Sequence, residues 1–166
     1  VSSARGRTRS RATSAARSSS CGPTTAPSTA PQGGSVSLVS RASLERLREE
    51  MGAQEAIDGR RFRMLFEIEG TAAHEEDEWL GRQVRIGDAT VVLNGDIGRC
   101  VVTSRDPDSG VVDLPTLVTL AGYRREGREE DLPFGVYGSV VVPGRVRVGD
   151  IAKPGDYPLD TGTIAV

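Results

Sequence analysis

The chain has 166 residues and a formal net charge of −2, and a chain of this length typically forms one domain. The charge is divided unevenly, because residues 1–35 carry five arginines and no acidic residue, whereas the rest of the chain holds sixteen basic and all 23 acidic residues. The first 35 residues are also rich in Ser, Thr and Ala and contain one large aliphatic side chain, Val1. Such a segment cannot bury enough apolar surface to offset the entropy of its ordering. We therefore predict that residues 1–35 are disordered and that residues 36–166 form a single folded domain.

The composition excludes several classes of protein. No run of apolar residues approaches the roughly 18 that cross a membrane, and no apolar run follows the N-terminal arginines as in a secretory signal. Two cysteines, Cys21 and Cys100, are too few for a disulfide framework or a cysteine-rich metal site. We expect a soluble cytoplasmic protein that acts on neither membranes nor nucleic acids. Two alternatives for the arginine-rich tail stay open, an organellar transit peptide and an arm for anionic surfaces.

The first elements of the folded part are a strand and a helix. The apolar run Val36–Val39 predicts a short strand. Ser40 or Ser43 can cap the helix that follows, since a hydroxyl at this position accepts a hydrogen bond from the first turn. Apolar residues then recur at helical spacing, at Leu44, Leu47 and Met51. Gly52 is expected to end the helix as its C-cap.

Short strands are predicted in the middle of the chain. From Arg61 onward apolar and polar residues alternate as far as Ile68, which predicts a strand with one apolar face. The acidic stretch His74–Glu78 is expected to be an exposed loop. Turns rich in glycine and aspartate, among them Asn94–Asp96, separate three further predicted strands, Gln83–Ile86, Ala89–Leu93 and Arg99–Ser104. Strands so closely spaced leave no room for crossover helices and are expected to pair antiparallel.

The last third of the chain predicts one helix and two strands. The apolar pattern of Leu114–Tyr123 favours a second helix, and the charged stretch Arg124–Asp131 indicates a surface loop. Phe134–Val142 has the pattern of a strand, and the turn Pro143-Gly144 leads into a further strand, Arg145–Val148. The predicted fold class is therefore mainly β with short helices, in the form of a small, mostly antiparallel β-barrel.

The motifs of common hydrolases and nucleotide-binding proteins are missing from the sequence. His74 is the only histidine, and the sequence contains neither G-x-S-x-G nor H-E-x-x-H. The stretch Gly95–Gly98 lacks the lysine and the following helix of a phosphate-binding loop. A histidine-based triad, a zinc site and a nucleotide-binding loop are therefore not expected.

Arg99 and Cys100 form the most informative pair of neighbouring residues. A thiolate is a soft metal ligand, and an adjacent guanidinium favours the ionised form of a thiol. From the residues alone, the more frequent role of such a cysteine is a small buried hydrophobic residue, and metal ligation is the alternative. Arg63 also has two interpretations, a solvated charge or a pocket residue that binds a phosphate group.

The segment from Gly98 to Gly110 resembles the signature of the MOSC domain family, which includes the C-terminal domain of molybdenum-cofactor sulfurases and the amidoxime-reducing enzymes. The resemblance continues in chain order over Leu38–Ser40 with Ala42–Leu44, Arg61–Arg63, Glu76-Asp77 with Trp79, Ile86–Asp88, Tyr123-Arg124, Phe134–Tyr137, and Pro143-Gly144 with Val148–Asp150. Each match is short, and their ordered combination carries the resemblance. It implies a β-barrel domain that binds a pterin-based molybdenum cofactor, molybdopterin.

The resemblance also implies roles for individual residues. Cys100 matches the cysteine that coordinates molybdenum, so it is the expected metal ligand and the expected catalytic residue. Arg63 and Arg99 match arginines that hold the anionic cofactor, and a guanidinium suits that role because it can bind an anion through two hydrogen bonds. Further cofactor-binding residues are expected at Thr103, Ser104 and Ser40, and a role in stabilising the predicted strand is the alternative for Thr103 and Ser104.

The function implied by the resemblance is the reduction of N-hydroxylated, amidoxime-like small molecules by a molybdenum-dependent oxidoreductase. No iron–sulfur spacing of cysteines is present, so electrons are expected from a separate donor protein. At the level of the family, pyridoxal phosphate binding is also implied. The alternative function is a non-catalytic carrier of the cofactor or of sulfur, which includes the case of a truncated family member.

Three further features bear on the match. For Glu76, Asp77 and Trp79 we favour a structural role. In this interpretation the carboxylates cap backbone N–H groups or form ion pairs, and the indole covers one end of the barrel. Residues 1–35 stand where amidoxime-reducing relatives have a second β-barrel domain. Met64-Leu65 stand where relatives have Pro-Asn, so a polar side chain is lost near the expected site.

Overall fold

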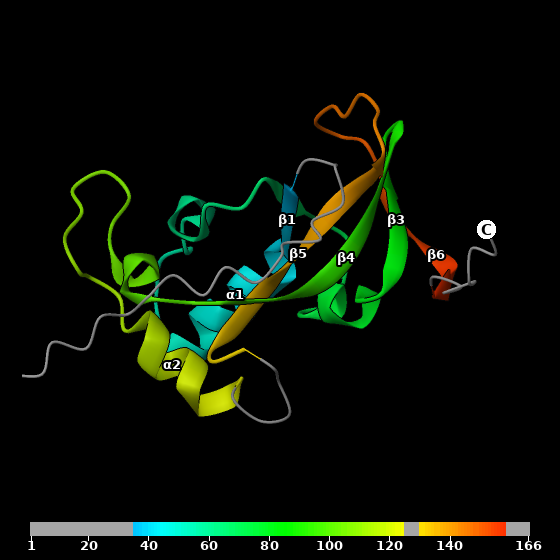
Figure 1. The fold of residues 1–166 in the computed structure, drawn as a ribbon. Helices are drawn as coiled ribbons and strands as arrows, with labels where there is room; N and C mark the ends of the chain where they lie inside the picture. Colours follow the sequence, from blue (N-terminus) through cyan, green and yellow to red (C-terminus); the bar gives the residue numbers. More distant parts are fainter. Residues whose placement is uncertain (1–34, 125–129, 159–166) are drawn as a thin grey trace, which may run out of the picture.

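The structure is a computed structural model that describes residues 35–124 and 130–158 (Figure 1). Two α-helices are α1 (Arg41–Met51) and α2 (Thr116–Tyr123). The strands are β1 (Ser35–Ser40), β2 (Phe66–Ile68), β3 (Arg82–Ile86), β4 (Ala89–Gly98), β5 (Pro133–Val142) and β6 (Ala152–Pro158). Short 3-10 turns are η1 (Gly59–Phe62), η2 (Glu75–Trp79) and η3 (Val101–Ser104). The prediction that residues 1–35 are disordered falls outside the described residues, except for Ser35, which begins β1.

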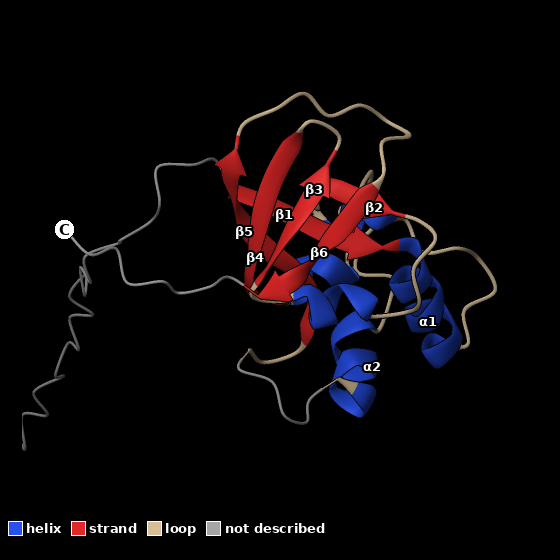
Figure 2. Ribbon diagram, turned by 90° about the vertical axis from the view of Figure 1, so that its right-hand side faces the viewer, coloured by secondary structure: helices blue, strands red, loops and turns tan. Residues whose placement is uncertain are grey.

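The strands form one sheet in the order β2-β1-β5-β4-β3-β6. β1 and β2 pair parallel, and the other neighbouring strands pair antiparallel. The sheet curls without closing, because no ladder joins its edge strands β2 and β6 in the described part of the chain (Figure 2). The predicted fold class, mainly β with short helices and mostly antiparallel, is confirmed, and the barrel is an open half-barrel.

Two clusters of buried apolar side chains hold the fold together. The first lies among the strands and η2 and includes Val36, Leu38, Trp79, Val84, Ile86, Val91, Leu93 and Val136. The second lies where the helices meet the sheet and includes Val39, Leu44, Leu47, Phe62, Leu120 and Phe134. Leu38 and Val39, which are neighbours in β1, therefore pack in different clusters, because side chains alternate between the two faces of a strand. Figure 2 shows both helices together at the lower right of the sheet.

The predicted ends of α1 are confirmed. The hydroxyl of Ser40 accepts a hydrogen bond from the backbone N–H of Ser43 at 3.1 Å, which satisfies one of the free donors of the first turn. Gly52 ends the helix with a φ of 65°, a left-handed conformation that glycine adopts without a steric penalty. No helix of the described ranges is long and apolar enough to cross a membrane.

The strand predicted to begin at Arg61 is wrong over its first half. The carboxylate of Asp58 caps η1 by accepting a backbone N–H of its first turn at 2.8 Å. Arg63 follows with a φ of 52°, a left-handed conformation that no strand contains. Phe62 is buried because its ring packs on Phe134 with 4.6 Å between centroids, so an apolar residue occurs here without strand pairing. Only β2 remains of the predicted strand.

Three other predicted boundaries are wrong. The predicted turn Asn94–Asp96 lies inside β4, where the ladder to β5 shifts register. Gly95 allows Tyr137 to approach, because a Cβ at this position would lie 2.8 Å from the tyrosine ring. The predicted strand Arg99–Ser104 does not form, because its first two residues lead into η3 and the other four make up η3. The predicted strand Arg145–Val148 is a loop. The sequence pattern does not predict β6, since proline and glycine interrupt its alternation.

Two carboxylates of the acidic stretch in η2, Glu76 and Asp77, are buried, so the prediction of an exposed loop is wrong for them, whereas Glu78 is exposed. Glu76 is fully buried, and its Oε1 accepts hydrogen bonds from the backbone N–H of Ser40 at 3.2 Å and from the Ser43 hydroxyl at 2.7 Å. Trp79 is buried in the first cluster. A structural role is therefore confirmed for the carboxylate of Glu76 and for the indole of Trp79.

Asp77, also in η2, forms a buried ion pair with Arg124. Arg124 Nη2 lies 2.7 Å from Asp77 Oδ2, and the side chains are 6% and 4% exposed. Arg124 Nε also donates to the carbonyl of Pro133 at 3.1 Å. The prediction of a surface loop is thus wrong at Arg124, and residues 125–129 lie outside the described residues.

Tyr123 supports a prediction about stability. Its hydroxyl is buried without a hydrogen-bond partner among the described residues, and burial raises the pKa of Tyr123 to about 12. An unsatisfied buried hydroxyl costs about 1–3 kcal/mol. Tyr123→Phe is therefore expected to raise the free energy of unfolding by about 1 kcal/mol at neutral pH, measured by urea denaturation.

The pH dependence gives this prediction a second readout. The tyrosine of the unfolded wild type ionises near pH 10, whereas the folded form resists ionisation up to about pH 12. The wild type should therefore lose stability as the pH rises from about 10 toward 12, and the difference from Tyr123→Phe should grow. Tyr137→Phe, at a half-exposed ring, is the matched control. A Tyr123→Phe variant less stable than the wild type would contradict the prediction.

Candidate functional site

Cys100 lies at the end of β4, immediately before η3, and its side chain is exposed. The interpretation as a small buried hydrophobic residue is therefore wrong. The carbonyl of Cys100 accepts hydrogen bonds from the backbone N–H and the hydroxyl of Thr103, at 3.1 and 3.0 Å. These bonds turn the chain sharply after the strand and leave the thiol at the surface.

The side chain of Arg99 is held by two backbone carbonyls and by the sulfur of a methionine. Its Nε donates to the carbonyl of Phe134 at 2.8 Å, its Nη1 donates to the carbonyl of Phe62 at 3.0 Å, and its Nη2 lies 3.0 Å from the sulfur of Met64. The guanidinium also lies 5.3 Å from the centroid of the Phe62 ring. Arg99 thus ties the end of β4 to η1 and to β5, and its donors are engaged by the protein itself.

The charge of Arg99 bears on the neighbouring thiol. Burial lowers the pKa of Arg99 to about 10, and the charge of Cys100 acts in the opposite direction. A pKa near 10 leaves the guanidinium protonated at neutral pH. A positive charge is therefore carried by the residue that directly precedes the exposed thiol.

Arg63 is exposed and has no side-chain hydrogen bond or ion pair with any described residue. It directly follows Phe62, whose carbonyl is bound by Arg99, and Arg99 directly precedes Cys100. The hydrogen bond between Arg99 and Phe62 therefore brings the backbone of Arg63 and that of Cys100 to the same end of the sheet. That Arg63 and Cys100 belong to one site stays a prediction.

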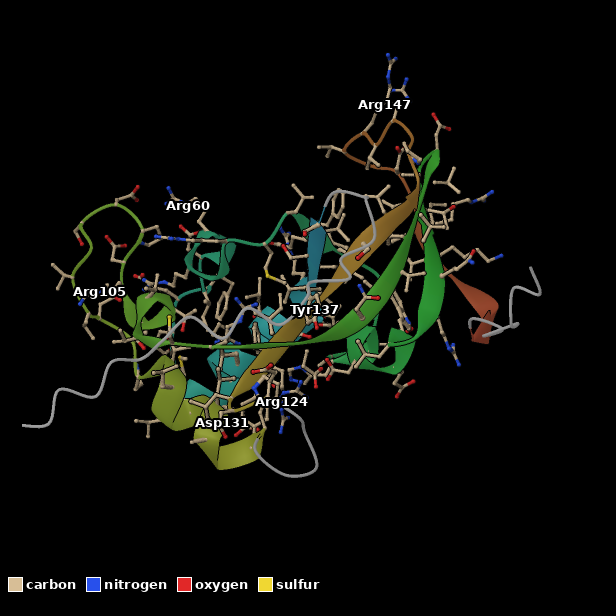
Figure 3. All side chains as sticks on the ribbon, in the orientation of Figure 1. Arg60, Arg105, Arg124, Asp131, Tyr137 and Arg147 are labelled. Atoms are coloured by element: carbon tan, nitrogen blue, oxygen red, sulfur yellow. The ribbon has the colours of Figure 1, made fainter. Side chains whose placement is uncertain are left out.

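A pocket of about 350 Å³ lies between η1 and the loop that follows η3. Its lining residues are Arg60, Arg61, Arg63, Val102, Arg105, Asp106, Pro107 and Gly110. Four of these eight are arginines, so we call it the arginine pocket. Arg60 and Arg105 come from the two facing segments and lie on the same side of the molecule (Figure 3). Val102 is two residues from Cys100, so the pocket adjoins the turn that carries the thiol.

Two arginine–aspartate pairs hold the walls of the arginine pocket together. Arg61 donates from Nη1 and Nη2 to the two carboxylate oxygens of Asp113, each at 2.7 Å. Arg60 binds Asp108 in the same two-pronged manner at 3.0 and 2.9 Å. The Arg61 guanidinium lowers the pKa of Asp113, so this carboxylate stays charged. Both pairs join η1 to the loop after η3.

The three predicted hydroxyl residues do not line the arginine pocket. The Thr103 hydroxyl donates to the Cys100 carbonyl, and the Ser40 hydroxyl caps α1. Ser104 is buried, and its carbonyl accepts the backbone N–H groups of Asp113 and Leu114 at 3.1 and 3.3 Å. Each therefore has a structural role here, and contact with a cofactor remains a prediction for them.

Sequence reasoning missed Arg60 and Arg105 and gave Arg61 no role at the site. The adjacent arginines at 60 and 61 and the repeated aspartates around the second segment were a visible signal, but only the fold brings the two segments together. The sequence does not show which arginine pairs with which aspartate, because residues in loops have no regular spacing.

A family model for the MOSC domain matches residues 28–153 of the chain. The chain belongs to the MOSC domain family. Mitochondrial amidoxime reducing component 2 of Rattus norvegicus is 34% identical over 122 residues, 69% of this chain and 35% of the relative. Mitochondrial amidoxime-reducing component 1 of Mus musculus is 35% identical over 120 residues, 68% of this chain and 34% of the relative. The chain thus spans about a third of the length of these curated relatives.

MOSC domains are associated with the molybdenum cofactor, and the residues of this site fit such a group. The exposed thiol of Cys100 is a soft donor suited to molybdenum, and the unpartnered Arg63 suits an anionic pterin. No group of three or more His, Cys, Asp or Glu side chains within the described ranges could hold a metal ion. The comparisons give no support to the predicted pyridoxal phosphate binding.

Proposed function

We propose that this MOSC domain binds the molybdenum cofactor and uses it to reduce N-hydroxylated, amidoxime-like small molecules. The observation that carries the proposal is the exposed Cys100 thiol beside the half-buried, charged Arg99, after the end of β4 and next to the arginine pocket. When bound, the cofactor supplies oxygen-atom transfer at molybdenum.

The residues of the chain have distinct roles in this proposal. Cys100 provides a thiolate ligand to the metal, because thiolates bind soft metals and the thiol is exposed at the rim of the site. Arg99 is a positioning residue, since its donors hold the backbone on either side of the site. Arg63 makes no side-chain hydrogen bond with the described residues, and in this proposal it binds the anionic part of the cofactor.

The substrate class and the electron source are inferred from the relatives. Their printed names describe amidoxime-reducing components. Reduction of an amidoxime to an amidine consumes two electrons and two protons and releases water. The sequence has no iron–sulfur spacing of cysteines, and the proposal includes a separate donor protein that delivers the electrons.

Metal analysis and a turnover assay test the proposal together. Protein purified from a cofactor-competent host is expected to contain molybdenum and pterin at close to one each per chain. With a chemical electron donor such as a reduced viologen, it should convert a simple aromatic amidoxime to the amidine. Protein that carries molybdenum and pterin but shows no turnover with any donor would favour the carrier function, and protein that contains neither would disprove the proposal.

A further inference from the structure

Asp113 joins η1 to η3 through its side chain and its backbone. Its carboxylate accepts the two-pronged hydrogen bonds of Arg61, each at 2.7 Å, and the Arg61 side chain is 7% exposed. Its backbone N–H donates to the carbonyl of Ser104, the last residue of η3, at 3.1 Å. The backbone N–H of Leu114 donates to the same carbonyl at 3.3 Å. The end of η3 is therefore anchored to a buried arginine of η1.

The start of η3 leads back to η1 through the residues around the thiol. Thr103 donates to the carbonyl of Cys100 from its backbone N–H and from its hydroxyl, which fixes the turn directly after the thiol. Arg99, the residue before Cys100, donates from Nη1 to the carbonyl of Phe62 at 3.0 Å. Phe62 directly follows Arg61 in η1. Both ends of η3 are therefore linked to neighbouring residues of η1.

These contacts form a closed ring that includes the turn with the thiol. Two links between η1 and residues 99–113 close the ring, the hydrogen bond from Arg99 to Phe62 and the ion pair of Arg61 with Asp113. A segment that is held at both ends has lost the motions that would separate those ends. The ion pair therefore restrains Cys100 although it lies at the other end of η3.

A second ion pair joins the same two segments without belonging to this ring. Arg60 binds Asp108 in the same two-pronged manner, but the two side chains are 61% and 73% exposed. Arg105 and Val112 pair with each other as an isolated antiparallel bridge, so Asp108 lies in the loop that this bridge closes. The pair of Arg60 with Asp108 therefore holds that loop and not η3, and an exposed ion pair contributes little to stability.

We propose that the ion pair of Arg61 and Asp113 positions the Cys100 thiol by holding the turn that carries it in one arrangement. Both are positioning residues, because they act on the thiol through the backbone of η1 and η3. The inference rests on the proposed function in one respect, the role of Cys100 as the metal ligand. A ligand that is held in place before the metal arrives needs little reorganisation on binding.

Hydrogen exchange at the backbone amide of Thr103 tests this positioning in protein from a host that cannot make the cofactor. This N–H donates to the carbonyl of Cys100, so its exchange rate, measured by NMR, reports the opening of the turn. Asp113→Asn keeps the size of the side chain and removes its charge. It is expected to speed the exchange by about tenfold, since a charge-assisted two-pronged contact is lost. Asp108→Asn is the matched control and should change the rate by less than about twofold.

Substitutions of Arg61 separate its charge from its two-pronged geometry. Lysine keeps the charge but cannot make two parallel hydrogen bonds to one carboxylate. The exchange rate of Arg61→Lys is therefore expected to lie between those of the wild type and Arg61→Gln. Backbone amides in the ladder between β4 and β5 report global stability as an internal reference. An unchanged rate at Thr103 in Asp113→Asn, or an equal increase at Thr103 and in this ladder, would overturn the proposal.

A second experiment examines the same variants from a cofactor-competent host. The EPR spectrum of the one-electron-reduced molybdenum reports the geometry of its ligands. Asp113→Asn is expected to retain molybdenum and to broaden or split this spectrum, because the thiolate then binds in more than one orientation. Asp108→Asn should give the wild-type spectrum, and the same spectrum in Asp113→Asn would contradict the positioning role. If no variant contained molybdenum, the proposed function would be disproved, and the exchange rate at Thr103 would still decide whether the ion pair holds the turn.

Discussion

Replacing Cys100 by serine is expected to remove nearly all molybdenum from protein purified from a cofactor-competent host. A serine hydroxyl is a hard, weakly acidic donor, whereas the proposed ligand of molybdenum is the soft thiolate of Cys100. The fold should survive the change, because the side chain of Cys100 is exposed and the carbonyl that shapes η3 is unaffected. Molybdenum is measured by elemental analysis, and the fold by circular dichroism and thermal unfolding.

Cys21→Ser provides the matched control for this experiment. Cys21 is the only other cysteine in the sequence, so the control removes one thiol and keeps Cys100. It is expected to retain the molybdenum content of the wild type. Equal metal content in the wild type and in Cys100→Ser would show that the thiol is no ligand, and equal loss in both variants would point to general instability.

Arg124→Leu is expected to lower the free energy of unfolding by about 3–5 kcal/mol, which is the usual cost of breaking a buried ion pair from one side. The substitution leaves the carboxylate of Asp77 charged in an environment where it is 4% exposed. It also removes the hydrogen bond to the carbonyl of Pro133. Since η2, α2 and β5 all meet at this arginine, the loss should appear as a lower midpoint in urea denaturation.

Arg41→Leu is the corresponding control at the surface. Arg41 pairs with Glu67 at 3.0 Å and with Glu69 at 2.9 Å, but its side chain is 66% exposed. Exposed ion pairs contribute at most about 1 kcal/mol, so this variant should stay close to the wild type. If both variants lost the same stability, the burial of the Arg124 pair would not be the cause.

The parts of the fold that the sequence predicted correctly depend on local physics. Helix α1 was predictable because its cap at Ser40 and its stop at Gly52 lie within the helix's own neighbourhood. β5 was predictable because a long apolar run with strand propensity indicates a buried strand. The resemblance to the MOSC family rested on short matches in a fixed order, and a family model confirms it.

The errors occur where long-range contacts override the local pattern. The alternation after Arg61 indicated a strand, yet η1 forms because Phe62 packs on Phe134 from β5. The acidic stretch of η2 indicated a surface, yet Glu76 and Asp77 are buried because α1 and Arg124 supply their partners. A carboxylate looks solvent-exposed in a sequence because its counter-charge is distant along the chain.

The same division holds for the candidate site. The sequence by itself determined the family and the presence of a thiol next to a guanidinium, because these groups belong to two adjacent residues, Arg99 and Cys100. Only the tertiary structure decided that the thiol is exposed and that Arg99 binds backbone carbonyls 35 and 37 residues away. It also created the arginine pocket, since Arg60 reaches Asp108 across 48 residues and Arg61 reaches Asp113 across 52. Local sequence specifies which groups are present, and the packing of distant segments specifies which of them meet and which donors stay free.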